Sequence, residues 1–452
     1  MTRPSPVSTS PSAQLTRSQR LDRLPFTRQH GRLLVGSGVG WALDAMDVGL
    51  VSFILAALAS QWSLSPGQLS AVASIGFVGM AVGASLGGLL ADRIGRRQVF
   101  ALTLLVYGLA TGASALVAGV GLLLVLRFLV GLGLGAELPV ASTLVSEYAP
   151  ARIRGRVVVA LEAFWALGWL LAALIGYLVV PSSADGWRWA FALGMVPAAY
   201  AIVVRWGLPE SVRFLERRGR PAEAEAAVRR FEESAGVAAP DPASSVAGPV
   251  SEAPALPWTR LWAPAHRRRT LALWLTWFGV NFSYYGAFIW LPTLLVADGF
   301  SLVKSFEYTL IITLAQLPGY AVAAILIERW GRRPTLATFL AGSALSAAAF
   351  GLADSVPLVL ATGMALSFFN LGAWGALYAV TPEIYPTDLR ATGAGSAAAF
   401  GRLASIAAPL LVPVLRESSG TAGLFTVFAL AFAVAAAAAL LLPEWRGRAL
   451  VD

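Results

Sequence analysis

The stretch LADRIGRR at residues 90–97 occurs a second time, in altered form, as LIERWGRR at residues 326–333. The two copies lie 236 positions apart. The same offset aligns three further pairs: Glu147 with Glu383, Pro150 with Pro386, and Arg154 with Arg390. A repeat of this length indicates two copies of one structural unit with the same polarity. In membrane carriers, such parallel repeats are related by an axis along the membrane normal, and the two halves can rock about a central cavity.

The composition places these halves in a membrane. Of the 452 residues, 57% are hydrophobic and 13% are charged, whereas soluble domains contain about 25% charged residues. Twelve helices of about 20 apolar residues need roughly 240 residues, which this chain supplies. We therefore expect an all-α membrane protein with twelve transmembrane helices in two pseudo-twofold-related six-helix bundles. The apolar segments are 35–58, 69–90, 99–118, 121–145, 157–179, 188–207, 271–295, 308–328, 335–352, 356–380, 392–414 and 421–442. A soluble enzyme, a disordered protein and a fibrous protein are excluded.

These segments divide the chain into five parts. They are an N-terminal tail at 1–34, a six-helix bundle at 35–207, a linker at 208–270 with a short helix at 221–235, a second bundle at 271–442, and a tail at 443–452. Residues 236–257, rich in Ala, Pro, Ser and Val, predict a flexible linker.

The basic residues predict the orientation. Most of the 34 Lys and Arg residues lie in the tails and in alternating loops on the side of the N-terminus. Because loops with excess Lys and Arg stay in the cytoplasm, we expect both termini there and the chain in the cell (inner) membrane. The net charge of +9 is then a topology signal, with minor contact to anionic lipid, and no nucleic-acid partner is expected. Cysteine is absent, and His30 and His266 lie in polar stretches, so we expect no metal site and no cofactor. We also expect a monomer.

Several motifs resemble those of the major facilitator superfamily. GGLLADRIGRR (87–97) matches its loop signature between helices 2 and 3, and ERWGRR (328–333) is a degenerate second copy. RFLVGLG (127–133) matches its fourth-helix pattern. PESVRFL (209–215) and PEWRGR (443–448) resemble the motifs that sugar and organic-ion transporters carry after helices 6 and 12.

Longer strings resemble the bacterial niacin transporters: GWALDAMDVG (40–49), LEAFWALGW (161–169), NFSYYGAFIWLP (281–292), GFSLVKSFEYTLIITLAQLPGY (299–320) and FFNLGAWGALYAVTPEIYP (368–386). The resemblance implies secondary active import of a small aromatic carboxylate, nicotinate or nicotinamide, by alternating access with proton coupling. The alternatives are a proton symporter for benzoate-like acids, a uniporter and an organic cation carrier.

Charges inside the apolar segments are the functional candidates, because a charge at the bilayer centre costs about 2.5–3.5 kcal/mol on insertion scales and usually faces a cavity. Arg402 lies in mid-segment, and its planar guanidinium matches a carboxylate. The resemblance implies the same role, since related organic anion transporters engage the anion with a similar helix-11 arginine. An internal salt bridge to Glu162 or to an Asp of the first helix is the alternative. The other substrate-binding candidates are polar and aromatic residues that share helix faces: Trp165, Glu162, Asn281, Tyr284, Tyr285, Gln316, Asn370 and Trp374. Together they suit a flat aromatic ring with one or two polar groups, and packing is the alternative.

Asp44 and Asp47 are three residues apart, so they share one face of the first helix. Two carboxylates at that spacing in a low-dielectric cavity do not both ionise easily, which makes the pair our candidate for proton coupling. Glu162 is the competing carboxylate. A pair held by arginines or backbone for stability alone is the alternative, and we interpret Arg127 and Glu137 as structural.

The loops on the basic side carry a repeated set of charges. We expect these residues to form a cytoplasmic gate, an ion-pair latch that stabilises the outward-open state: Asp92, Arg93, Arg96, Arg97, Glu147, Arg154, Glu328, Arg329, Arg332, Arg333, Glu383 and Arg390. A role in topology alone is the alternative. Without a P-loop or a convincing catalytic set, we do not expect an enzyme. A membrane enzyme, a channel and a receptor are the competing classes, and saturable uptake with counterflow separates a carrier from them.

Overall fold

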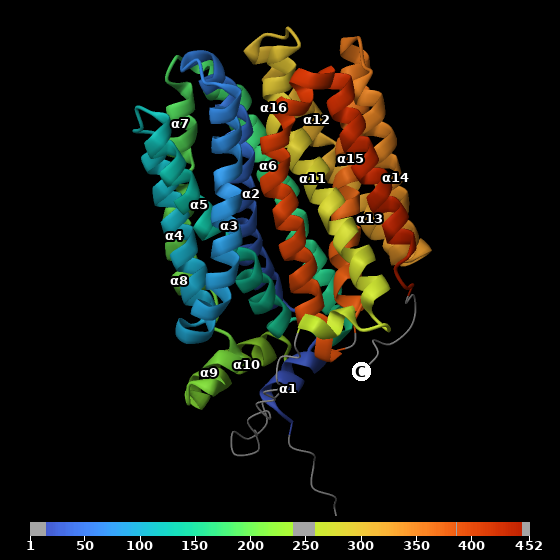
Figure 1. The fold of residues 1–452 in the computed structure, drawn as a ribbon. Coiled ribbons are helices and arrows are strands. Elements are labelled where there is room, and N and C mark those ends of the chain that lie inside the picture. The colour runs from blue at the N-terminus through green and yellow to red at the C-terminus, as the bar shows by residue number, and fades with distance from the viewer. Residues whose placement is uncertain (1–14, 238–257, 386, 445–452) are drawn as a thin grey trace, which may run out of the picture.

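The computed structural model describes residues 15–237, 258–385 and 387–444, and its elements are α-helices with short 3-10 turns (Figure 1). The first half of the chain contains α2 (Arg28–Gln61), α3 (Pro66–Ile94), α4 (Arg96–Ser114), α5 (Val120–Tyr148), α6 (Arg154–Leu178), α7 (Gly186–Leu193) and α8 (Val196–Gly207). The second half contains α11 (Arg267–Ala297), α12 (Leu302–Leu314), α13 (Gln316–Trp330), α14 (Arg332–Gly351), α15 (Val356–Val380) and α16 (Thr387–Leu440). Three helices lie outside these bundles: α1 (Arg17–Arg23), α9 (Val212–Arg217) and α10 (Pro221–Ser234). The segment 238–257, predicted as a flexible linker, lies outside the described residues.

Ten helical segments of the described chain are long and apolar enough to cross a membrane. One of them, α16, contains two helices, because Gly420 (φ 68°) interrupts its helical backbone. The less apolar α4 packs against α5 and α8 inside the first half. Counting α4 and both parts of α16, the structure matches the twelve expected crossings.

Two predicted continuous segments are broken in the middle. The segment 308–328 is divided at Ala315 into α12 and α13, and 188–207 is divided between α7 and α8. Proline explains both breaks, because it cannot donate the backbone hydrogen bond that continues a helix. Pro318 follows the first break by three residues, and Pro197 lies in the first turn of α8.

Within each half, the helices pack closely through small residues. The pairs α3 with α5 and α2 with α6 build the first half, and α11 with α16 and α14 with α15 build the second. At the contact of α3 with α5, a Cβ on Gly131 would overlap the backbone of Gly76, and one on Gly79 would overlap the backbone of Phe128. Glycine at these positions allows the two helix backbones to approach each other directly.

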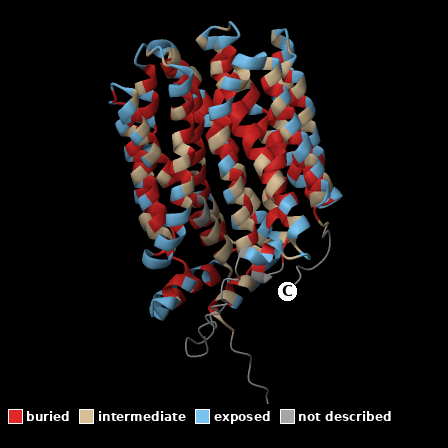
Figure 2. Cartoon of the chain, viewed as in Figure 1, coloured by how far each residue is buried: buried red, intermediate tan, exposed pale blue. Residues whose placement is uncertain are grey.

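The halves meet along α2 with α11, α3 with α16, and α6 with α12, α13 and α15. Figure 1 shows the two bundles side by side, with α1, α9 and α10 together at one end. The most apolar stretches of α2 and α11 are 89% and 83% buried, against 39–56% in the other spans, and Figure 2 shows buried residues concentrated on the inner helices. Residues of α2 and α11 therefore lie at the centre of the molecule.

The N-terminal region, predicted as a tail, contains a docked helix. Arg17 of α1 forms ion pairs with Glu216 (2.9 Å) and Glu225 (3.0 Å). Arg20 forms ion pairs with Glu225 (2.9 Å) and Glu232 (2.6 Å). These side chains are at most 13% exposed, so α1 is held against α9 and α10 by a buried network of charges.

Candidate functional site

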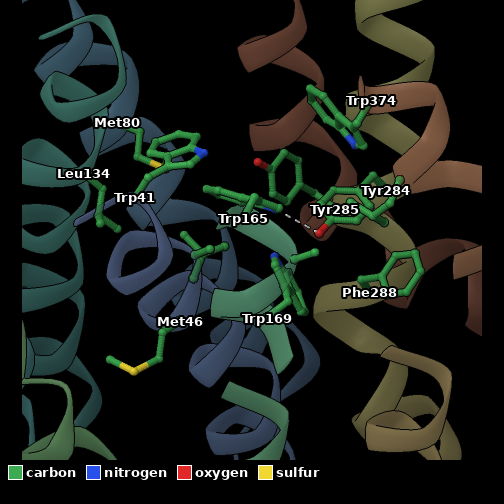
Figure 3. Close-up of a cluster of buried hydrophobic side chains, with 14 of the residues drawn as sticks. Trp41, Met46, Met80, Leu134, Trp165, Trp169, Tyr284, Tyr285, Phe288 and Trp374 are labelled. Carbon is green, nitrogen blue, oxygen red and sulfur yellow. Dashed lines mark hydrogen bonds between the residues drawn. The ribbon is translucent and has the colours of Figure 1, made fainter. Parts of the chain in front are cut away.

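An aromatic cluster joins the two halves at the centre of the molecule (Figure 3). Trp165 of α6 donates a hydrogen bond from Nε1 to Oη of Tyr284 of α11, at 3.2 Å. The ring of Trp41 lies 4.9 Å from that of Trp165, and the ring of Trp374 lies 5.8 Å from that of Tyr284. These aromatic residues come from α2, α6, α11 and α15, so each half supplies part of the cluster. The predicted convergence of Trp165, Tyr284 and Trp374 is seen in the structure.

Arg402 of α16 lies at the edge of this cluster. Its Nη1 is 4.0 Å from Sδ of Met80, which is only a weak hydrogen-bond acceptor. The hydroxyl of Tyr285 and the carboxylate of Glu162 are near enough to interact with the guanidinium electrostatically. Among the described residues, however, none places a carboxylate oxygen within 4 Å of Arg402. The alternative of an internal salt bridge is therefore not seen in this conformation, and a partly buried cation remains available for an anion.

Among the predicted substrate-binding residues, Gln316, Asn370 and Trp374 bury polar atoms that have no hydrogen-bond partner within the described residues. The amides of Gln316 and Asn370 are fully buried, and neither these amides nor Nε1 of Trp374 has a partner in the described part of the chain. Gln316 begins α13 at the break in that span, while Asn370 and Trp374 lie one turn apart on α15. Leaving such a group unpaired costs about 1–3 kcal/mol, so these groups favour a polar ligand or water.

Asn281 is an exception among the predicted substrate-binding residues. Its Nδ2 donates to the carbonyl of Trp277 at 2.8 Å, and its Oδ1 accepts from Oγ of Ser405 at 2.9 Å. Both ends of the amide are therefore bonded within the protein, and in this structure Asn281 connects α11 to α16 instead of facing the cluster with free polar atoms.

The structure separates the two first-helix carboxylates that we predicted to act as a pair. Asp47 forms an ion pair with Arg127 of α5 at 3.1 Å and also accepts a hydrogen bond from Thr111. Asp44 lies beside Glu137 of α5, which is fully buried. In the described part of the chain, neither carboxyl group forms an ion pair within 4 Å, and their polar neighbours are each other and Tyr107. The close carboxyl pair therefore bridges α2 and α5, and sequence spacing along α2 could not show this.

The loop charges mainly connect helices within one half. Asp92 of α3 contacts Arg96 (3.4 Å) and Arg217 (3.1 Å), and Arg96 contacts Glu147 (3.6 Å). In the second half, Arg332 bonds Glu383 at 2.6 Å.

One ion pair in the described chain joins the halves at this end. Arg156 of α6 and Glu328 of α13 lie 3.1 Å apart, and both are exposed. Our set of gate residues omitted Arg156, although it follows Arg154 by two positions. Arg154 instead bonds Asp22 of α1. The described residues place no carboxylate within 4 Å of Arg329 or Arg390.

The turn that joins α3 to α4 and the turn that joins α13 to α14 make equivalent contacts, which we call joints. Gly95 has φ 103°, a conformation that favours glycine. Glu210 accepts from the backbone N–H of Arg97 at 3.2 Å, and Nη1 of Arg97 donates to the carbonyl of Leu208 at 3.3 Å. The second half repeats this joint with Gly331, Arg333, Leu442 and Glu444. Each joint connects the turn between two helices to the end of the sixth helix of its half.

A cavity of about 20 Å³ lies where the halves meet, lined in part by Phe77, Met80 and Arg127. It has room for about one water molecule. This volume is too small for an aromatic ring.

Comparisons with known proteins agree with this architecture. Residues 31–452 match the model of the family described as sugar (and other) transporters. The chain is 50% identical over 433 residues to the niacin transporter NiaP of Acinetobacter baylyi, covering 95% of this chain and 98% of that protein. It is 48% identical over 413 residues to the putative niacin/nicotinamide transporter NiaP of Bacillus subtilis, covering 91% and 95%. A structure of the xylose transporter XylE from E. coli, partially occluded and inward open, aligns with a TM-score of 0.75 at 20% identity, covering 93% of this chain and 99% of that one.

The chain belongs to the sugar (and other) transporter family. It is a multi-pass secondary transporter with the major facilitator fold, and the family is one of transporters, not enzymes.

Proposed function

We propose that this carrier transports nicotinate, and nicotinamide less tightly, by alternating access. The observation that carries the proposal is Arg402, a cation beside an aromatic cluster without an ion pair among the described residues. The names of the two NiaP relatives support the same substrate. The pyridine ring stacks on aromatic faces such as Trp165 and Tyr284, and the carboxylate accepts two parallel hydrogen bonds from the guanidinium. We assign the buried amides of Gln316 and Asn370 to the ring nitrogen or to a carboxamide.

Substitution of Arg402 tests this assignment. A hydrogen bond to a charged group contributes about 1.5–3 kcal/mol, so Arg402→Ala should weaken nicotinate binding by about 10- to 150-fold. Uncharged nicotinamide should lose less, and Arg402→Lys should restore only part of the affinity because the planar fork is absent. Arg416→Ala is the matched control, since Arg416 lies on the same helix but pairs with Asp298. Binding and proteoliposome uptake, with benzoate and a cationic amine as competitors, provide the measurement. Wild-type nicotinate affinity in Arg402→Ala overturns the assignment, and preference for benzoate favours the benzoate-like alternative.

We further propose that uptake is coupled to protons through Asp44 and Glu137. Two adjacent buried carboxylates without ion pairs cannot both be charged at an acceptable free energy, so the pair holds at least one proton. Asp47 differs because Arg127 neutralises it. Nicotinate is an anion, and moving one charge against about 100 mV costs roughly 2.3 kcal/mol, which co-transport of one proton removes.

The coupling proposal predicts faster uptake at acidic external pH and loss of uptake with a protonophore. Asp44→Asn and Glu137→Gln should each abolish uphill uptake while sparing exchange. Glu162→Gln tests the competing carboxylate, and Asp47→Asn should instead destabilise the protein by leaving Arg127 unpaired. Uptake that ignores an imposed pH gradient at clamped membrane potential identifies a uniporter and refutes the coupling.

The orientation also belongs to the proposal: the end with α1, α9 and α10 faces the cytoplasm of a cell whose inner membrane holds the carrier. Because the chain lacks cysteine, single cysteines report accessibility without background. In intact cells, a membrane-impermeant thiol reagent should label Val303→Cys, at the start of α12, and should not label Glu233→Cys in α10. The reverse pattern refutes the orientation. At the cytoplasmic end, we propose that Arg156 and Glu328 form the part of the latch that joins the halves.

A further inference from the structure

A cavity of about 240 Å³ lies outside the transport site, between the turn that joins α3 to α4 and the linker helices α9 and α10. Four arginines line it: Arg93, Arg97, Arg218 and Arg220. They come from segments more than 100 residues apart in the chain, which the fold brings to one place. The proposed binding of nicotinate uses none of them.

The two carboxylates that line the cavity, Glu210 and Glu223, already have hydrogen-bond partners in the protein. Glu223 holds Arg220 through two hydrogen bonds of 2.6 Å. Oε1 of Glu210 accepts from three backbone N–H groups, those of Arg96, Arg97 and Ser211. The cavity therefore keeps an excess of positive charge.

Three of the cavity arginines lack a carboxylate partner. In the described chain, no carboxylate oxygen lies within 4 Å of Arg93, Arg97 or Arg218. Nε of Arg97 is buried and has no hydrogen-bond partner in that part of the chain. Arg218 donates to the backbone carbonyl of Arg93, which fixes the guanidinium of Arg218 at the end of α3. Grouped guanidinium ions with unused donors match the oxygens of an anion.

The cavity has an apolar side that continues along α3. Ile94, Phe214 and Leu215 contribute to its lining. Leu86, Leu90 and Ile94 follow each other at one-turn spacing on α3 and are 51%, 36% and 42% exposed. If the charged headgroup of a lipid occupied the cavity, its acyl chains could lie along this apolar surface of α3.

We propose that this cavity binds a phosphate group, with Arg93, Arg97 and Arg218 as its ligands. Guanidinium ions bind phosphate in a planar, bidentate manner, and a dianionic or monoanionic phosphate compensates the excess charge. The phosphate belongs either to an anionic phospholipid, whose chains follow α3, or to a soluble phosphorylated compound. In both cases the bound group would connect the α3–α4 turn to the linker helices.

Binding by the full-length, delipidated carrier tests the proposal. Phosphatidylglycerol and pyrophosphate are added in separate arms, and native mass spectrometry and the shift in thermal stability are measured. The wild type should retain one probe molecule saturably. Arg218→Gln should weaken its binding at least tenfold, while Arg230→Gln, which removes an exposed arginine of α10 outside the cavity, should not. Arg93→Gln gives the same information if Arg218→Gln does not fold.

The arms distinguish the sources of the phosphate. Binding of phosphatidylglycerol alone identifies a lipid, and binding of pyrophosphate alone identifies a soluble compound; competition between the two shows that both use one site. Binding of neither probe, or binding that is equal in Arg218→Gln and Arg230→Gln, overturns the proposal.

Discussion

Trp165→Phe should shift the conformational balance of the empty carrier away from the state described here. The hydrogen bond from Trp165 to Tyr284 joins the two halves in a buried position. Rocking of the halves must break it. Phenylalanine keeps an aromatic ring but removes the donor, so Oη of Tyr284 loses the only partner recorded for it in the described chain.

The structure sets the size of this effect. Tyr284 is fully buried, and leaving a buried hydroxyl without a partner costs about 1–3 kcal/mol. This cost destabilises the conformation in which Tyr284 is buried, and it is absent in a conformation in which water reaches the hydroxyl. The equilibrium should therefore move about 5- to 150-fold toward conformations with separated halves.

Distances between spin labels measure the shift. In the cysteine-free chain, Ser60→Cys at the end of α2 and Val303→Cys at the start of α12 are both exposed, and α2 and α12 meet through Phe53 and Phe306, with ring centroids 5.2 Å apart. Trp206→Phe is the control, because Trp206 is 75% exposed. Equal distance distributions for the Trp165→Phe, Trp206→Phe and parent proteins would show that the hydrogen bond does not bias the equilibrium.

Four further outcomes are expected. Arg20→Met removes the ion pair of the buried Glu232 and one of those of Glu225, at a cost of about 3–5 kcal/mol for a broken buried pair. Helix α1 should therefore undock, and residues 17–24 should lose protection from hydrogen exchange and proteolysis; unchanged protection would contradict the network. Burial raises the pKa of Glu225, but hydrogen bonds from Arg20 and a neighbouring arginine outweigh this and hold the pKa below its usual range. Docking of α1 should therefore be complete above about pH 4.5 and should be lost as the pH falls through the lowered pKa. Tryptic cleavage after a pH jump measures this loss. Gly131→Ala should lower the free energy of unfolding by about 1–3 kcal/mol, because the added Cβ overlaps α3. Gly88→Ala should have little effect, since an added Cβ there meets nothing within 4 Å. Equal melting temperatures for the two variants would refute the packing argument. Glu328→Gln should increase labelling of cysteines placed between the halves at the end that carries α1, α9 and α10, and no increase would leave its pair with Arg156 without a gating role.

The number of crossings and the repeat could be predicted from the sequence because both depend on local hydropathy and on spacing within the chain. Helix periodicity also placed Trp165 and Tyr284 on inward faces, which the structure confirms. Periodicity does not show which neighbouring helix an inward residue meets. Asp44 and Asp47 share a face of α2, yet a rotation of about 60° and one turn of rise direct one to Glu137 and the other to Arg127.

The sequence also could not predict which buried polar side chains find hydrogen-bond partners. Asn281 and Asn370 look alike as inward amides, but Ser405 bonds the first, whereas the second has no partner in the described chain. Docking of α1 depends on pairs such as Arg20 with Glu232, which are 212 residues apart. Only the tertiary fold creates such contacts.

The joints at Gly95 and Gly331 are equivalent in the two halves, whereas the residues at the centre of the molecule are not. At the repeat offset, Asp44 and Glu137 correspond to Val280 and Ala373, while Arg402 corresponds to an alanine. The partners diverged in the opposite sense as well, since Gln316 and Asn370 correspond to Met80 and Leu134. The two halves therefore share their joints and differ at the centre: the first half carries the carboxyl pair, and the second carries the arginine and the two amides that lack a partner in the described chain.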